Sequence, residues 1–400
     1  MNPTEYAKAL QASMAGKELA FPVEEFDQRI KAARRAMDAA GLDVLLVTHR
    51  PDLCYLTGYS TFGVGNHACF VLPREGDPVL QVTAIEIPAG TAASWVRDLR
   101  CAPWVGQASA GAQLGDIVKE KGFDAKRIGI QTQISGLLPN ILDQIKAALP
   151  KATFADASEL VARQRFVKSP REMACLRKAA AYTEAGVRAS LAVIRAGTTD
   201  NDVVRAGYDA MIAAGSEFMT VQPIVTSGAR TGYAHQSFRR LTIAPGDPVF
   251  LEYGGCHQRY TSALMRTAVA GQPEKGVEAL ADAVLATIDA VIATARPGRT
   301  GHDVAMAAKA AHKHMSDEFF LPGAYGYHVG IGFPPTWADV IGFLAEGSEI
   351  VLEPDMVFHL PLAFRCPGRF GVGISETIHI TKAGCEPMTN LPRGLHRAPG

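Results

Sequence analysis

The chain has 400 residues, of which 48% are hydrophobic and 20% are charged. This length and composition allow large apolar cores, so we expect a folded protein of two or three domains and exclude a disordered one. Lys plus Arg and Asp plus Glu number 40 each, so no overall charge attracts nucleic acid or an anionic membrane surface, and a small polar ligand is the expected partner.

The first 164 residues predict an α/β domain. An amphipathic helix runs from about Phe21 to Ala40, Gly41 follows as its C-cap, and Val44–Val47 forms a buried strand. The strand-like runs ACFVL, PVLQVT and KRIGIQT then alternate with helical segments. We place the end of this domain at residue 164.

The remaining residues, 165–400, predict an α+β domain. The segment RFVKSPRE leads into a helical pattern from Met173 to Ala196, with Ser169 as N-cap and Pro170 as the first helical residue. A helix over 201–214, strands over about 219–270, helices over about 274–316 and a strand-rich end follow. Helices flanking an antiparallel sheet are the expected arrangement.

The cysteines and the apolar runs indicate the compartment. Seven cysteines are scattered along the chain without a Cys-x-x-Cys pair, which is typical of reduced thiols. There is no run of about 18 apolar residues, and the N-terminal segment lacks the apolar stretch of a signal peptide. We therefore expect a cytoplasmic protein that does not enter a membrane.

Seven segments of the second domain follow one another in a fixed order: KSPRE, SGARTGYAH, GDPVFLEYGG, RYTSALMRT, GYHVGIGFPP, DMVFHLP and GISETIHIT. Together they resemble the pita-bread family of creatinase, prolidase and methionine aminopeptidase. The opening FPVEEFDQRIKAARRAMDAAGLDVLLVT and the later PDLCYLTGY resemble the creatinase-type N-terminal domain. The resemblance implies a creatinase-type α/β domain followed by a pita-bread, or aminopeptidase P-like, catalytic domain.

The metal-dependent members of this family bind two metal ions with two Asp, one His and two Glu. The matching positions here are Glu252, Ala263, Tyr327 (with His328 adjacent), Pro361 and Glu376. Two hard divalent ions need several bridging carboxylates, and alanine and proline offer no ligand side chain. We therefore expect no metal and no other cofactor. The alternative is a single-ion site built by His328, His359 and the two glutamates.

The metal-free members of the family act on guanidinium or amidine compounds, whose central carbon is already electron-poor. Glu252, at the end of a buried VFL run and before two glycines, is expected to bind the substrate cation and to attack that carbon. His235 resembles the histidine that creatinase uses as general acid and base, and Glu376 is assigned an electrostatic binding role. The structural alternatives are an ion pair of Glu252 with Arg259 or Arg266, a backbone-bonded loop histidine, and a strand salt bridge at Glu376.

Four further side chains are candidates for the wall of a substrate pocket, each with core or rim packing as the alternative. They are Tyr327, His328, Trp337 and His359. A substrate carboxylate prefers a bidentate guanidinium, and the arginines considered for this are Arg239, Arg240, Arg259 and Arg266. Of these, Arg266 is expected to pin the sheet internally.

The segments GARTGYAH, EYGGCHQRY and GYHVGIGFPP, with Trp337 close behind, most resemble ectoine hydrolases. The resemblance implies metal-independent opening of a cyclic amidine to an N-acetylated diamino acid by a homodimer. The N-terminal domain departs from that pattern after GDPVLQVTAIEIPAG. The alternatives are a creatinase-like amidinohydrolase, a Xaa-Pro dipeptidase-like peptidase, and a non-catalytic pseudo-enzyme that binds peptides.

Overall fold

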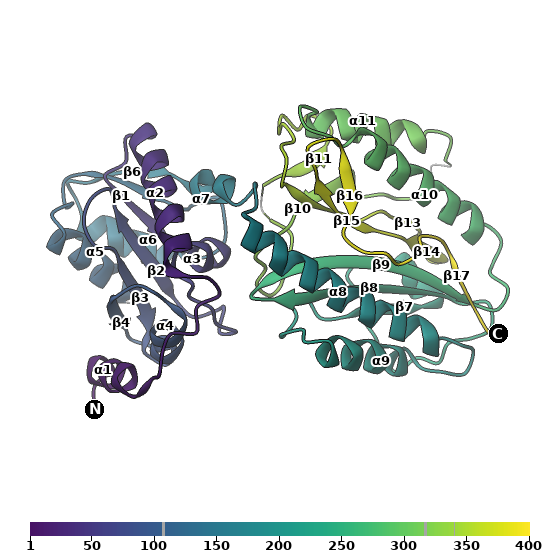
Figure 1. The fold of residues 1–400 in the computed structure, drawn as a ribbon, viewed down its shortest axis with the longest axis horizontal. Coiled ribbons are helices and arrows are strands. Elements are labelled where there is room, and N and C mark those ends of the chain that lie inside the picture. The colour runs from purple at the N-terminus through teal and green to yellow at the C-terminus, as the bar shows by residue number, and fades with distance from the viewer. Residues whose placement is uncertain (106–108, 316–317, 340) are drawn as a thin grey trace. The chain divides into compact units, whose positions relative to one another are not determined.

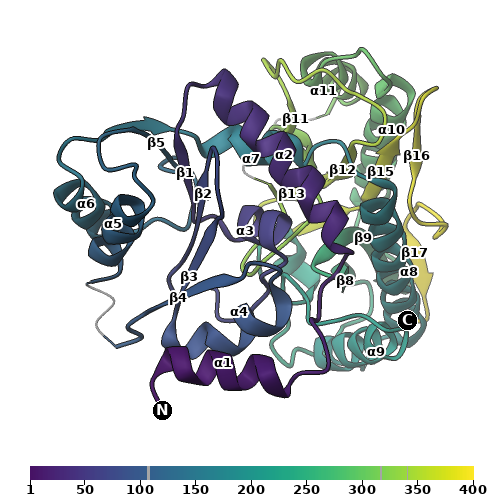
Figure 2. The same ribbon diagram turned by 60° about the vertical axis from the view of Figure 1, so that its left-hand side comes forward.

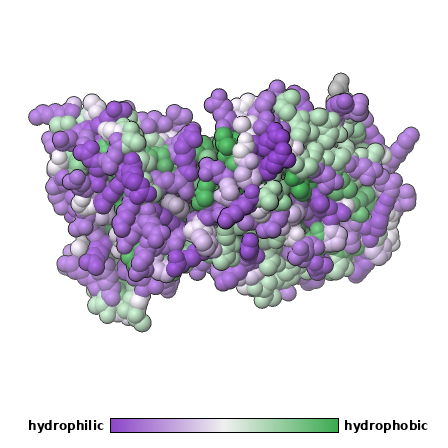
Figure 3. Space-filling model, turned by 45° about the horizontal axis from the view of Figure 1, so that its top comes forward, coloured by the Kyte–Doolittle hydropathy of each residue, from purple (hydrophilic) through white to green (hydrophobic). Residues whose placement is uncertain are grey.

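The computed structural model describes residues 1–105, 109–315, 318–339 and 341–400. Its contacts divide the chain into two compact units, Met1–Arg165 and Phe166–Gly400 (Figure 1). Hydrophilic residues cover much of the face shown in Figure 3, with smaller apolar areas between them. Among the described residues, every helix is too short or too polar to span a bilayer.

The first unit is an α/β sandwich built on a six-stranded sheet of order β4-β3-β2-β1-β5-β6. β1 pairs antiparallel with β2 and parallel with β5, so the sheet is mixed. Its strands are β1 Val44–Val47, β2 Ala68–Pro73, β3 Val79–Thr83, β4 Asp98–Ala102, β5 Arg127–Ile130 and β6 Thr153–Asp156. Its helices are α1 Pro3–Ser13, α2 Val23–Ala39, α3 Arg50–Thr57, the 3-10 helix η1 Ala84–Glu86, α4 Ile87–Ala93, α5 Ala110–Glu120, α6 Pro139–Ala148 and α7 Ser158–Gln164. Figure 2 shows α5 and α6 side by side at one end of this unit.

In its described residues, the second unit combines three sheets with four long helices. The sheet orders are β17-β9-β8-β7, β11-β10-β12-β15-β16 and β13-β14. The strands are β7 Ile224–Ser227, β8 Pro248–His257, β9 Tyr260–Ala270, β10 Ala324–His328, β11 Phe343–Ala345, β12 Val357–Leu360, β13 Ala363–Cys366, β14 Phe370–Gly373, β15 Glu376–Ile380, β16 Cys385–Pro387 and β17 His396–Ala398. The helices are α8 Pro170–Val193, α9 Asp200–Ala213, the 3-10 helix η3 Gly228–Gly232, α10 Val277–Thr294 and α11 Gly301–Ala311.

Helices flank the sheets of the second unit, as the sequence predicted. α8 packs against α9, β8 and β9, whereas α10 and α11 lie on the other side of the unit (Figure 1). There α10 contacts β13 and β14, and α11 contacts β10 and β11. Two apolar cores result, one under α8 and α9 and one under α10 and α11. The α/β and α+β fold classes expected from the sequence are confirmed.

Helix α8 begins where the sequence places it. Ser169 Oγ accepts the Glu172 N–H, and the Glu172 carboxylate accepts the Ser169 N–H, so both ends of a capping box are present. The helix ends at Val193, three residues before the expected Ala196. Ile194 instead adopts an extended backbone (ψ 123°) and is only 2% exposed. The chain thus leaves the helix at Ile194, whose side chain is buried in the core.

Side-chain alternation along β8 decides which residues face the interior between the sheets. Val249, Leu251 and Tyr253 belong to the core under α8 and α9. Successive side chains of a strand point to opposite faces. Phe250 and Glu252 therefore point the other way, toward the β13–β14 hairpin.

Candidate active site

Glu252 is a carboxyl group that the fold has withdrawn from water. It lies in β8, opposite Met265 of β9, and is 6% exposed. Burial raises the pKa of Glu252 to about 7, although the positive charge of Arg365 acts in the opposite direction. A carboxyl group with this pKa can take up or release a proton near neutral pH and is a strong counter-ion for a buried cation.

A chain of hydrogen bonds crosses three strands beside Glu252. Trp337 Nε1 donates to Tyr327 Oη at 2.8 Å, and Tyr327 Oη lies 2.8 Å from His359 Nδ1. His359 Nε2 lies 2.8 Å from Ser375 Oγ, which also accepts the Met265 N–H at 2.6 Å. The cross-strand pairing of Tyr327 with His359 places the two rings on one face of the sheet.

The titratable side chains in this series of hydrogen bonds are uncharged at neutral pH. Burial lowers the pKa of His359 to about 3, so its imidazole carries no charge at neutral pH. Burial, reinforced by the nearby Glu252 carboxylate, raises the pKa of Tyr327, so its phenol stays protonated. Tyr327 therefore lies close to Glu252 and remains a hydrogen-bond donor there.

A neutral imidazole donates through one ring nitrogen and accepts through the other, which limits the proton order in the chain. If Ser375 donates to His359 Nε2, then Nδ1–H donates to Tyr327 Oη. Tyr327 Oη accepts from Trp337 as well, so both its lone pairs are used. In this order the Tyr327 proton remains available for a further acceptor.

Arg365 of β13 also faces this region, and it was not among the arginines considered from the sequence. Its guanidinium carbon lies 6.0 Å from the centroid of the Phe250 ring. Burial lowers the pKa of Arg365, and the Glu252 carboxylate raises it, so the two charges act on each other. The interior between β8, β12, β13 and β15 thus contains an acid, a guanidinium and a neutral hydrogen-bonded chain.

Comparisons with known proteins identify the family. Residues 174–382 match the model of metallopeptidase family M24, and residues 29–167 match the creatinase/prolidase N-terminal domain. The chain belongs to the M24 creatinase/prolidase family. The resemblance stated from the sequence is thereby confirmed.

Relatives of this M24 protein include enzymes with different substrates. It is 27% identical to the ectoine hydrolase of Halomonas elongata, with 94% of this chain and 98% of that protein covered. It is 30% identical to the uncharacterized hydrolase/peptidase y4tL of Sinorhizobium fredii, with 94% and 97% covered. The Xaa-Pro dipeptidase structure from Bacillus anthracis aligns with a TM-score of 0.80 at 23% identity over 93% of this chain and 99% of that one. The structural likeness establishes the shared fold.

The donor set at the family's metal positions does not fit a dinuclear centre. Ala263 lies opposite Gly254 on the Glu252 side of the β8–β9 ladder and offers only a methyl group. Tyr327 is hydrogen-bonded to Trp337 and His359, and Pro361 has no donor atom in its side chain. Within the part of the chain that the structure describes, no group of three or more His, Cys, Asp or Glu side chains is placed to hold a metal ion.

Glu376 does not join Glu252. Its carboxylate accepts from Arg266 Nη2 at 2.8 Å and from Thr389 Oγ1 at 3.0 Å. Arg266 is paired with Leu251 and so points to the face of β9 opposite to Met265 and Glu252. This is the strand salt bridge that was the structural alternative for Glu376, whereas Ser375 takes the position facing His359.

Arg266 holds the sheet together internally, as expected. Its guanidinium donates to the carbonyl oxygens of Met265, Ser375, Leu391 and Pro392 in addition to Glu376. Arg259 stacks between Phe218 and Phe333 and donates to Gly332 O. Arg239 and Arg240 are exposed.

His235 lies on an exposed turn after η3, with a left-handed backbone (φ 53°). The structure gives its ring no hydrogen bond or ion pair with the described residues. Arg230 braces the same loop by donating to Ser237 O at 2.8 Å. Among the described residues no hydrogen bond or ion pair joins His235 to Glu252, and its role in proton transfer stays a prediction.

His328 points away from Tyr327, its neighbour in β10. Its Nε2 contacts Lys168 Nζ, its Nδ1 lies 3.2 Å from Asp339, and Phe166 packs edge-on against its ring at 4.7 Å. Adjacent residues of a strand face opposite sides. His328 thus belongs to a buried polar cluster behind the sheet, while Tyr327, Trp337 and His359 share one side.

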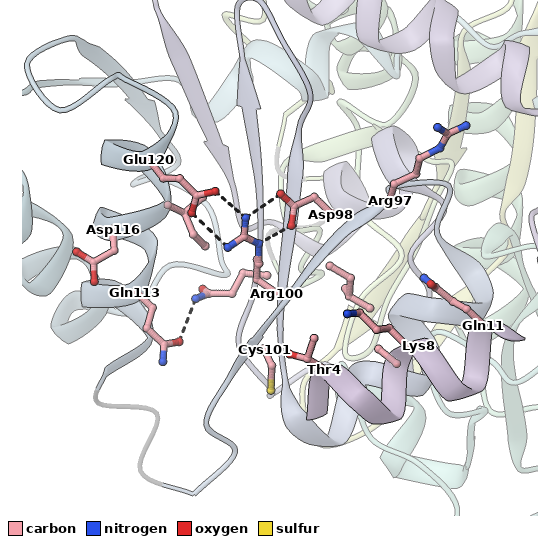
Figure 4. Close-up of a pocket in the computed structure, with 14 residues that line it drawn as sticks. Thr4, Lys8, Gln11, Arg97, Asp98, Arg100, Cys101, Gln113, Asp116 and Glu120 are labelled. Carbon is pink, nitrogen blue, oxygen red and sulfur yellow. Dashed lines mark hydrogen bonds and ion pairs between the residues drawn. The ribbon is translucent and has the colours of Figure 1, made fainter. Parts of the chain in front are cut away.

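A separate hollow lies in the first unit between α1, β4 and α5 (Figure 4). Its most prominent side chain, Arg100, points between two carboxylates, those of Asp98 and Glu120. Arg100 Nη2 donates to Asp98 Oδ2 at 3.0 Å and to Glu120 Oε1 at 2.8 Å. The charges of Arg100, Asp98 and Glu120 neutralise one another, so this cluster carries no evidence of a ligand.

Proposed function

We propose that this protein is a metal-independent hydrolase of a small cyclic amidine or related C–N compound, with ectoine-like ring opening as the reaction. The observation that carries the proposal is Glu252, a buried carboxyl group with a pKa of about 7. It stands at a metal position of the family. The matching positions of Ala263 and Pro361 offer no ligand atom, and the Glu376 carboxylate is paired with Arg266. The full-length similarity to an ectoine hydrolase supports the substrate class.

Glu252 supplies the negative charge that a buried cationic substrate needs as its partner. An amidinium ion brings its own positive charge, so it replaces a metal ion as the partner of the carboxylate. Its approach lowers the pKa of Glu252 and converts the carboxyl group to the anion. Substrate binding therefore generates the nucleophile.

The reaction then follows in two steps. A Glu252 oxygen bonds to the amidine carbon, the C=N electron pair moves to nitrogen, and the ring C–N bond breaks as the leaving nitrogen gains a proton. Water then attacks the same carbon, restoring the Glu252 carboxyl group and leaving an N-acetylated diamino acid. Tyr327 and His359 are both neutral, so they can bind the substrate without competing with its cation for the Glu252 carboxylate.

A peptidase is the second candidate, because several relatives are peptidases. The chain is 24% identical to the Xaa-Pro dipeptidase of Lactobacillus delbrueckii over 90% of its length, with 96% of that protein covered. A peptide carbon is not electron-poor, and the metal-dependent enzymes activate water against it with metal ions. The unsuitable donor set around Glu252 therefore favours the amidine over the peptide.

A hydrolysis screen distinguishes these candidates. Purified protein is treated with a chelator, its metal content is measured, and it is incubated with ectoine, hydroxyectoine, creatine or Xaa-Pro dipeptides. We expect an N-acetylated diamino acid from ectoine, at a rate unchanged by the chelator and abolished in Glu252→Gln. Cleavage of dipeptides alone, restored by added metal, would establish the peptidase instead.

We also propose that the protein acts in the cytoplasm as a homodimer on a small molecule. The absence of nucleic acid and membrane from its partners stays a prediction based on the balanced charge of the chain. Light scattering on the eluting protein measures the oligomeric state directly.

A further inference from the structure

The β13–β14 hairpin places an arginine over the face of β8 that carries Glu252. Ala363 and Arg365 are two residues apart in β13, so their side chains share a face. Ala363 packs in a small apolar cluster with Phe250 and Met265. Phe250 is two residues before Glu252, so Arg365 and Glu252 are directed into the same interior.

Two glycines of β14 allow this close approach. Gly371 pairs with Arg365 across the hairpin, and a Cβ atom at residue 371 would lie 3.1 Å from Arg365 Cγ. A Cβ atom at Gly373 would lie 2.2 Å from Cε2 of Phe250. At residue 371 the nearest atom to such a Cβ would be the Thr231 carbonyl oxygen, at 2.2 Å. A larger side chain there would displace η3 as well as Arg365, and one at residue 373 would displace Phe250.

The guanidinium of Arg365 has an N–H donor that no acceptor among the described residues satisfies. Nη1 donates to Ala363 O at 3.2 Å, whereas Nε is buried and finds no acceptor among the described residues. A buried donor without an acceptor costs free energy, and a bound ligand or water that accepts from it removes that cost. The described residues show no ion pair that joins this guanidinium to Glu252, although the two charges influence each other.

We propose that Arg365 binds the carboxylate of the substrate, so that the site selects a zwitterion with its cation at Glu252 and its anion at Arg365. A guanidinium matches a carboxylate with two parallel N–H donors. Such a ligand neutralises both buried charges at once, which a plain cation or a plain anion does not. This inference rests on the proposed function, since it names the second half of the substrate that Glu252 receives.

Matched ligand pairs test this assignment by isothermal titration calorimetry. The pairs differ only in the carboxylate: ectoine and its carboxamide, creatine and its carboxamide, and Ala-Pro and Ala-prolinamide. We expect the wild-type protein to bind at least one carboxylate about 10- to 100-fold more tightly than its carboxamide. We expect Arg365→Gln to remove that preference while changing carboxamide binding by less than about threefold.

Two further variants separate binding from folding. Arg365→Lys keeps the charge without the two parallel donors and should retain part of the preference. Arg369→Gln changes an exposed arginine of the same hairpin, ion-paired with Glu274, and should leave the preference intact. Thermal unfolding of each variant verifies that it is folded.

The inference is overturned if no pair shows a carboxylate preference in the wild-type protein. It is also overturned if Arg365→Gln keeps the full preference, or if both members of a pair lose affinity equally in that variant. The proposed function is tested separately, by whether the wild-type protein hydrolyses ectoine. A protein that fails to hydrolyse ectoine but loses carboxylate preference in Arg365→Gln would refute the substrate and keep the subsite.

Discussion

Replacing Glu252 by glutamine should stabilise the protein above neutral pH while it abolishes activity. Burial raises the pKa of Glu252 to about 7 from its usual 4.5. A group whose pKa is raised on folding binds its proton more tightly in the folded state, so the folded state is penalised once the pH exceeds the unfolded value. The penalty begins near pH 4.5 and is complete above pH 7.

The size of the effect follows from the shift in the pKa of Glu252. Each unit corresponds to about 1.4 kcal/mol, so the penalty above pH 7 is about 3 kcal/mol. Glutamine resembles the protonated carboxyl group and does not titrate. Glu252→Gln and the wild-type protein should therefore have similar unfolding free energies at pH 4.5, and the variant should be more stable by about 3 kcal/mol at pH 8.

Urea unfolding of the two proteins at pH 5, 6, 7 and 8 measures this difference. Glu353→Gln, at an exposed position, is the matched control and should show no pH-dependent gain. A stability difference that does not change with pH would refute the assigned burial cost, and so would a wild-type protein that is the more stable one at pH 8. Saturating ectoine should shrink the wild-type penalty, because a bound cation lowers the pKa of Glu252.

The hydrogen-bonded chain and the ion pair behind it give two further predictions. Tyr327→Phe leaves the Trp337 N–H without its acceptor, so it should reduce the unfolding free energy by about 1–3 kcal/mol and turnover by more than tenfold. The control Tyr325→Phe removes a hydroxyl that contacts His312 instead, and equal activity loss in both variants would contradict a special role for Tyr327. Arg266→Met alone leaves the buried Glu376 carboxylate without its ion-pair partner. It should lower the free energy of unfolding, measured with urea, by about 3–5 kcal/mol. Adding Glu376→Gln should recover part of that loss, and strict additivity of the two changes would show that the pair is not coupled.

The family and the two-domain plan could be predicted from the sequence because their signals are local. The capping box of α8 lies within four consecutive residues, Ser169 to Glu172, and forms without help from distant segments. The loss of metal ligands is equally local, since an alanine at 263 or a proline at 361 lacks a donor atom in any fold. The burial of Glu252 could be predicted for the same reason, since it is an acid inside an apolar strand next to glycines.

Only the tertiary structure decided which side chains share the site. A shift of one residue along a strand turns a side chain to the opposite face, so Ser375 meets His359 while Glu376 meets Arg266. Arg365 and Glu252 influence each other's charge because a glycine-lined hairpin folds over β8, although the two residues are more than a hundred positions apart in the chain. The sequence shows residue type and spacing directly. The face of the sheet to which a side chain points and the position of the hairpin depend on packing between segments that are distant in the chain.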